Sequence, residues 1–171
     1  SCAIRFPYFI EKTAPVSGTP GIMEYHCAYE GKVSDSQKDF YITIEVPVTT
    51  LCPCSKAISE YGAHNQRGKV TVKLLYSSFF WIEDIIDLIE KSASAPLYSV
   101  LKRQDEKHVT EQAYDNPRFV EDVVREVYTN LKKLHFKRFS VEAENEESIH
   151  LHNAYAYTEF GGPSTGSGIT R

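Results

Sequence analysis

The sequence lacks a long apolar segment, a large excess of either charge, and a cysteine framework. No apolar run in its 171 residues approaches the roughly 20 residues of a membrane-spanning helix, and its start shows no basic-then-apolar signal pattern. The 19 basic and 23 acidic residues give a net charge of −4 without a dense basic stripe, which argues against duplex nucleic acid. Four cysteines do not indicate a disulfide scaffold. We therefore expect a cytoplasmic protein that binds neither membranes nor nucleic acid, although small anionic ligands remain compatible with the composition.

What is present is an ordinary globular composition, 42% hydrophobic and 25% charged, at a length that corresponds to about one domain. Prolines and glycines are frequent in residues 1–21, which we interpret as an N-terminal arm or loop. Residues 22–160 carry the regular patterns and form the expected folded module. Residues 161–171 are rich in glycine and serine, which is typical of a flexible tail.

Several segments alternate apolar and polar residues with the period of two that predicts half-buried strands. The clearest is the segment in which Phe40, Ile42 and Ile44 alternate with more polar residues. The expected strands are residues 23–33, 38–48, 67–76, 138–144 and 150–158.

Two segments change to the period of a helix. Residues 79–91 place isoleucines at helical spacing among acidic residues, and residues 116–133 open on Asn-Pro and continue as a stripe of valines and leucines. The order of strands, two helices and strands predicts an α+β protein whose helices pack on one face of an antiparallel sheet. The open edges of such a sheet invite pairing with another subunit.

The segment richest in reactive side chains is residues 47–67, between two expected strands. Cys52 and Cys54 are separated by one proline, and His64 follows ten residues after Cys54, so one turn could bring a thiolate and an imidazole together. This donor pair is typical of zinc-type ligation, and a site with three protein ligands leaves a position for water. The alternative is that both cysteines are small buried hydrophobic residues, because Cys-x-Cys is not the spacing of a structural zinc knuckle.

Two further clusters allow a functional and an ordinary interpretation. Residues 102–122 have the composition of a solvated loop, but Glu106 could be an oxygen ligand. Glu121 suits the first turn of a helix, and its carboxylate could also accept two hydrogen bonds from a guanine. Residues 145–152 combine carboxylates and histidines, which fits either acid–base groups or a polar hairpin turn.

Five segments together carry a closer resemblance, namely residues 11–18, 47–56, 61–67, 101–122 and 145–150. In this order they resemble the type IB GTP cyclohydrolases, over about residues 6–157. The resemblance implies a tunnelling fold that assembles through its sheet edges. It also implies hydrolysis of GTP to 7,8-dihydroneopterin triphosphate and formate, the first step of pterin and folate synthesis.

The same resemblance implies that Cys52, His64 and Glu106 hold a divalent metal. A set of one thiolate, one imidazole and one carboxylate accepts zinc, manganese or iron, so the identity of the metal stays open. The metal would activate the water that attacks C8 of guanine. Glu121 matches the carboxylate that anchors the guanine.

Cys54, Glu147 and His150 match further active-site positions beside Cys52. Our hypothesis is that His150, oriented by Glu147, moves protons while the imidazole ring opens. The candidates for binding the triphosphate are Lys56, Arg67, Lys102 and Arg103. The alternative is that they are ordinary solvated side chains.

Members of this family are usually longer, with an additional N-terminal tunnelling-fold module that we do not find here. We expect a homo-oligomer, with a tetramer as one candidate. The alternatives are a variant of the same fold that forms a cyclic phosphate of dihydroneopterin, a non-catalytic metal-binding module of an oligomer, and a redox role for Cys52 and Cys54.

Overall fold

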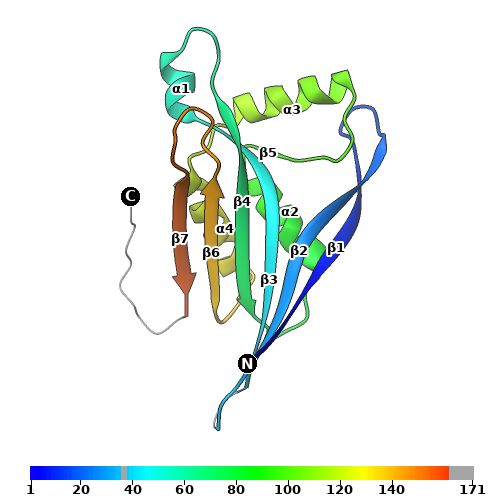
Figure 1. The fold of residues 1–171 in the computed structure, drawn as a ribbon, viewed down its shortest axis with the longest axis vertical. Helices are drawn as coiled ribbons and strands as arrows, with labels where there is room; N and C mark the ends of the chain where they lie inside the picture. The colour runs from blue at the N-terminus through cyan, green and yellow to red at the C-terminus, as the bar shows by residue number, and fades with distance from the viewer. Residues whose placement is uncertain (36–37, 162–171) are drawn as a thin grey trace.

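The computed structural model describes residues 1–35 and 38–161, which form one antiparallel sheet with helices against it (Figure 1). The sheet has the strand order β1-β2-β3-β4-β6-β7, and the short β5 pairs with the end of β3. The strands are β1 (Cys2–Thr13), β2 (Pro20–Val33), β3 (Lys38–Leu51), β4 (Asn65–Leu75), β5 (Ala95–Pro96), β6 (Phe139–Asn145) and β7 (Ala154–Phe160). The helices are α1 (Pro53–Ile58), α2 (Ile82–Ser92), α3 (Arg103–Asp115) and α4 (Val120–Lys133).

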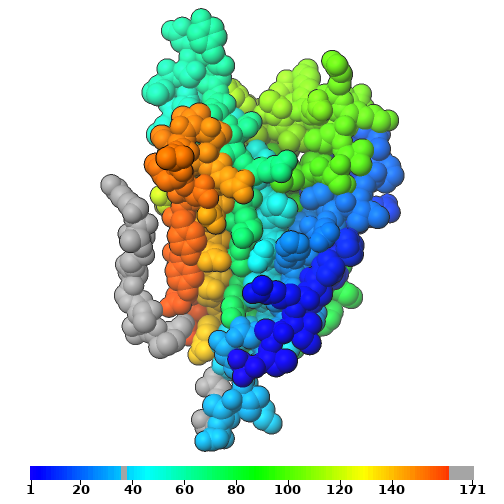
Figure 2. Space-filling model, in the orientation of Figure 1, coloured from blue at the N-terminus to red at the C-terminus, as the bar shows by residue number. Residues whose placement is uncertain are grey.

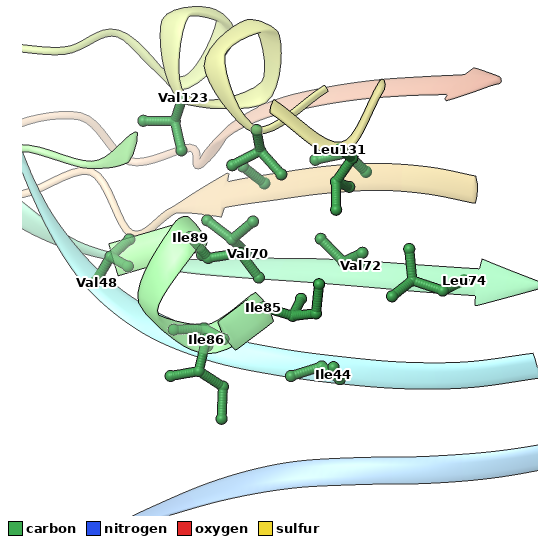
Figure 3. Close-up of a cluster of buried hydrophobic side chains, with 14 of the residues drawn as sticks. Ile44, Val48, Val70, Val72, Leu74, Ile85, Ile86, Ile89, Val123 and Leu131 are labelled. Carbon is green, nitrogen blue, oxygen red and sulfur yellow. The ribbon is translucent and has the colours of Figure 1, made fainter. Parts of the chain in front are cut away.

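The hydrophobic core lies between one face of the sheet and the helices α2 and α4. Ile44 on β3 and Val72 on β4 are fully buried, as are Ile89 on α2 and Leu131 on α4 (Figure 3). This arrangement follows from the sequence, because the period of two in the strands and the helical spacing in α2 and α4 each gather their apolar residues on one face. The predicted α+β class with an antiparallel sheet is confirmed.

Two helices were not expected. We read residues 102–122 as a solvated loop, but α3 occupies most of that segment, and the short α1 interrupts the non-strand segment after β3. Helix α3 buries only Asp105 and Ala113, so it carries no apolar stripe that could have revealed it. The expectation of two helices was therefore wrong.

The N-terminal segment also differs from the arm or loop that we expected. Residues of β1 pair with β2 along their whole length, from Cys2 opposite Gly31 to Thr13 opposite Pro20. A proline is tolerated at Pro7 because β1 lies at the edge of the sheet. Only the turn between β1 and β2, where Gly18 has a φ of 65°, keeps the loop character that the prolines and glycines indicated.

Element boundaries shift by a few residues elsewhere. Strand β7 begins at Ala154 and not at residue 150, since residues 146–153 form the connection from β6. The expected tail lies outside the described residues, apart from Gly161. Among the described residues, no helix combines the length and the apolar character needed to cross a membrane.

Candidate active site

The candidate site lies where β3 ends and β4 begins, beside the connection from β6 to β7. The backbone N–H of Cys52 donates to the carbonyl of His64 over 3.1 Å, which closes the segment that contains α1. The hydroxyl of Ser55 reinforces this closure, because it donates to the Cys52 carbonyl and accepts from the His64 N–H, both over 3.2 Å. Cys52 and His64, 12 positions apart in the sequence, are thus fixed side by side.

The thiol of Cys52 is at the start of α1. Cys52 is the N-cap residue, and its Sγ accepts a hydrogen bond from the Ser55 N–H over 3.5 Å, while Pro53 occupies the first helical position. Cys52 is half-buried, whereas Cys54 is exposed on the first turn of α1. The sequence between the two cysteines therefore directs them into different environments.

The imidazole of His64 is held by two neighbours. Its Nδ1 lies 3.1 Å from Oε1 of Gln66 and 3.2 Å from Oγ of Ser148. The amide nitrogen of Gln66 donates to Oε1 of Glu147 over 3.4 Å. Since Nδ1 is occupied by these contacts, Nε2 is the ring nitrogen left for a metal or a substrate.

The β6–β7 connection supplies Glu147 and Ser148. Its start is fixed by the sheet, because Gly68 pairs with Asn145 and the Glu146 N–H donates to the Arg67 carbonyl over 2.9 Å. This connection and the segment around α1 lie next to each other at one end of the molecule (Figure 2). Sequence reasoning missed Gln66 and Ser148, since an amide and a hydroxyl in a polar segment carry no distinctive signal.

A buried carboxylate anchors the start of α3 to the β1–β2 turn. Asp105 is fully buried and accepts hydrogen bonds from the N–H groups of Val16, Ser17 and Lys102 over 2.8, 2.8 and 2.9 Å, and from the Ser17 hydroxyl over 2.7 Å. Burial by itself raises the pKa of Asp105, but these hydrogen bonds outweigh it and hold the pKa below its usual range. Asp105 thereby fixes the start of α3, and with it the neighbouring Glu106, to the β1–β2 turn.

The structure does not bring all the predicted residues together. Glu106, Glu121 and His150 are exposed, and His150 stacks on His152 with 5.3 Å between ring centroids. No three His, Cys, Asp or Glu side chains converge as a metal site within residues 1–35 and 38–161. Glu147 contacts Gln66, so the contact by which we expected it to orient His150 is absent from the described hydrogen bonds.

Helix α4 nevertheless begins beside this end of the sheet. The Arg118 N–H donates to the Leu51 carbonyl over 3.0 Å, and the Asn116 side chain donates to the Ala93 carbonyl over 2.8 Å. These bonds place the first turn of α4, which includes Glu121, next to the residue that precedes Cys52.

The candidate cations differ in their availability. The ammonium group of Lys56 donates to the Tyr114 carbonyl and lies 4.2 Å from the centre of the Tyr114 ring. Arg67 follows Gln66 on β4, so its side chain points to the opposite face of the sheet. Lys102 and Arg103 are exposed at the start of α3. We therefore retain these two as the candidate cations.

A hollow of about 780 Å³ lies away from this site, on the face of the sheet opposite α2 and α4. Its lining alternates with the core residues along the strands and includes Arg5, His26, Glu45, Lys73 and Glu142. None of the residues predicted for catalysis or metal binding contributes to it.

The fold and the site define an α+β protein with a thiol, an imidazole, and a buried amide bonded to a half-buried carboxylate, at one end of an antiparallel sheet. Comparison with known proteins matches residues 1–156 to the family described as type I GTP cyclohydrolase FolE2, and the chain belongs to this family. The label type IB, which the motifs suggested, is corrected to this family name.

Similar proteins include GTP cyclohydrolase FolE2 of Syntrophus aciditrophicus, which is 62% identical over 91% of this chain and 62% of its own length. The protein of the same name in Geobacter sp. strain M21 is 59% identical over 91% of this chain and 58% of its own length. The protein of the same name in Syntrophotalea carbinolica is 58% identical over 94% of this chain and 61% of its own length. The chain thus spans about three fifths of the length of the curated relatives it matches.

Proposed function

We propose that this chain supplies catalytic residues of a GTP cyclohydrolase, which converts GTP and water to 7,8-dihydroneopterin triphosphate and formate in pterin and folate synthesis. The observation that carries the proposal is the pairing of Cys52 with His64 at the end of β3, in a chain of the FolE2 family. A relative with this family name is 62% identical to the chain. The cytoplasm is the compartment that we propose for this reaction.

The donor chemistry of Cys52 and His64 fits a divalent metal such as zinc, manganese or iron, with Glu106 as the oxygen ligand. A metal held by these residues would lower the pKa of a bound water and so supply the nucleophile for C8 of guanine. For Glu106 the proposal rests on its match to the metal ligand of the family; in this chain Asp105 fixes the start of α3, and with it Glu106, to the β1–β2 turn.

Other residues bind the substrate or move protons. Glu121, in the first turn of α4, accepts two hydrogen bonds from N1–H and the exocyclic amine of guanine. His150 is exposed on the β6–β7 connection, and we assign it the transfer of a proton to or from the substrate during ring opening. Cys54, exposed beside Cys52, is a further candidate contact, and Lys102 and Arg103 are candidates for the triphosphate.

The assembly belongs to the same proposal. A tunnelling fold joins open sheets edge to edge, and the described part of this sheet has β1 and β7 as its outer strands. We propose a homo-oligomer formed through these edges, with a tetramer as one candidate.

The deciding experiment is anaerobic turnover of GTP by metal-stripped protein after addition of zinc, manganese or iron, with formate as the readout. We expect one formate for each GTP consumed and a product with the mass of 7,8-dihydroneopterin triphosphate. A product with the mass of a cyclic phosphate would identify the variant reaction. Bound metal and an intact oligomer without formate release would identify a non-catalytic module and reject the proposal.

Two variants test the assigned roles. Glu121→Gln removes a charged acceptor and should weaken GTP binding by about 10- to 100-fold, whereas Glu111→Gln on the exposed side of α3 should not. His150→Ala should abolish turnover and leave the metal content intact. Loss of the metal in His150→Ala would instead make His150 a ligand.

A further inference from the structure

We propose that Gln66 is a positioning residue through which Glu147 determines which ring nitrogen of His64 carries the proton. The three side chains come from the start of β4, the β6–β7 connection and the residue before β4. They form a chain of two hydrogen bonds, from His64 Nδ1 to Gln66 Oε1 over 3.1 Å and from Gln66 Nε2 to Glu147 Oε1 over 3.4 Å.

The direction of both hydrogen bonds follows from the chemistry of Glu147. An ionised carboxylate can only accept hydrogen bonds, so Gln66 must turn its NH₂ group toward Glu147. The carbonyl oxygen of the same amide then faces His64. Because that oxygen can only accept, Nδ1 of His64 must carry the hydrogen. The negative charge at Glu147 thus selects the tautomer of His64 that has a free lone pair on Nε2.

Burial and a second acceptor make this selection firm. Gln66 is only 8% exposed, so its amide cannot readily exchange these partners for water. Its register partner on β3, Thr50, is fully buried, which confines the amide from that side. The hydroxyl oxygen of Ser148, 3.2 Å from Nδ1, can accept from the same N–H.

The consequence for function rests on the proposed role of His64 as a metal ligand. A neutral imidazole binds a metal through the nitrogen that holds the lone pair, and Nε2 is that nitrogen when Nδ1 is protonated. Loss of an outer hydrogen-bond partner of this kind typically weakens metal binding by about 10- to 100-fold. In this proposal Glu147 acts on His64 through Gln66, whereas our hypothesis from the sequence paired Glu147 with His150.

The tautomer itself can be measured without substrate or metal. In ¹⁵N-histidine-labelled, metal-free protein, long-range ¹H–¹⁵N correlations should show His64 protonated at Nδ1. Gln66→Leu removes the acceptor, and we expect the signal to move toward the Nε2–H form. Glu147→Gln should give a mixture of the two forms, because an amide at position 147 no longer dictates the orientation of Gln66. A wild-type His64 protonated at Nε2, or an unchanged tautomer in Gln66→Leu, would overturn the proposal.

Metal affinity gives the second readout, by competition with a chelator for zinc and for manganese. Gln66→Leu should bind about 10- to 100-fold more weakly and Glu147→Gln less severely so. The double variant should be no weaker than Gln66→Leu, since Glu147 acts through Gln66. Gln112→Leu, at an exposed position of α3, is the matched control and should retain the wild-type affinity. Additive losses in the double variant would mean that Glu147 acts independently.

These outcomes separate the chain of hydrogen bonds from Glu147 through Gln66 to His64, which we call the relay, from the proposed function. Failure of the wild-type protein to release formate, with the expected tautomer and metal affinities, would reject the cyclohydrolase function and keep the relay. Normal turnover with an unaltered tautomer in both variants would reject the relay alone. Should Gln66→Leu not fold, Glu147→Gln, at a half-buried residue of an otherwise exposed connection, still decides the tautomer question.

Discussion

At the scale of single residues, several buried or half-buried acids hold protons that the unfolded chain would lose at alkaline pH. The hydroxyl of Tyr8 on β1 donates to Glu83 on α2, and this hydrogen bond, together with burial, raises the pKa of Tyr8 to about 12. Burial, followed by the charge of Glu90, raises the pKa of Tyr25. Burial raises the pKa of the Cys27 thiol to about 11. All three groups join β1 or β2 to the core.

The sign of the resulting pH dependence is defined by these raised values. A group whose folded pKa is higher than its unfolded one adds stability that is complete below the unfolded pKa and disappears as the pH rises through the folded value. The free energy of unfolding should therefore fall between about pH 9 and 12. Tyr8→Phe should lower the free energy of unfolding by about 1 kcal/mol at pH 8, because it leaves a carboxylate oxygen of Glu83 without its donor. From pH 10 to 12 the variant should lose less stability than the wild type does.

Urea titrations across this pH range check the prediction. The matched control is Tyr61→Phe, because Tyr61 is 98% exposed after α1 and should keep the wild-type profile. Parallel curves for Tyr8→Phe and the wild type above pH 10 would show that Tyr8 does not contribute to alkaline unfolding.

At the scale of elements, a partly buried ion pair ties β1 to α2, and the same lysine bonds the residue that follows β5. The ammonium group of Lys12 donates to both oxygens of Glu90, over 2.8 and 2.7 Å, and to the Leu97 carbonyl over 2.8 Å. It also lies 4.3 Å from the centre of the Tyr98 ring, and Tyr25 donates to Glu90 over 2.9 Å. One lysine thus connects an edge strand to the helical layer.

We expect Lys12→Met to destabilise the protein by about 3 kcal/mol, because the buried Glu90 loses its counter-charge. The double variant with Glu90→Gln should recover a large part of this loss, since no uncompensated charge remains. The free energy of unfolding, measured in urea, gives the coupling between the two sites. Lys91→Met, which breaks an exposed pair with Asp87, serves as the control and should change stability by less than about 1 kcal/mol. A double variant as unstable as Lys12→Met would show that the uncompensated charge of Glu90 does not cause the loss of stability.

The elements that could be predicted are those whose burial is periodic. The sequence locates β3 and α4 to within a few residues, because Ile44 on β3 and Leu131 on α4 each belong to a repeating set of apolar residues. Helix α3 was missed because it is stabilised at its first turn by Asp105 and a distant turn, a contact that no local pattern contains. In β1, Phe6, Tyr8 and Ile10 alternate with more exposed residues, but the prolines in and after this segment favour a loop.

The same distinction holds for the site. The backbones of Cys52 and His64 meet because these residues flank the connection between the paired strands β3 and β4, and the order of strands in the sequence indicates such a pairing. The contacts of His64 with Gln66 and Ser148 depend on the register of β4 against β6, which sequence patterns do not specify to one residue. The catalytic and metal-binding roles of the predicted residues stay predictions.

At the scale of the whole molecule, the helices cover only one face of the sheet, and the described part leaves the edges β1 and β7 open. Both edges carry exposed apolar side chains, with Phe9 59% exposed on β1 and Tyr157 44% exposed on β7. Unprotected edges with apolar side chains pair readily with other strands. If β1 of one copy meets β7 of the next, the contact is heterologous, and a rotation that closes gives a ring of copies.

Light scattering during size-exclusion chromatography tests this assembly. The wild-type chain of 19.4 kDa should elute with the mass of several copies. A head-to-tail contact uses both edges, so Phe9→Lys or Tyr157→Lys alone should shift the mass toward one copy. Leu134→Lys, at an exposed apolar residue just after α4, should keep the wild-type mass. If only one edge variant dissociates the assembly, that edge pairs with the same edge of a second copy. A constant mass of 19.4 kDa for the wild type would reject assembly through the edges.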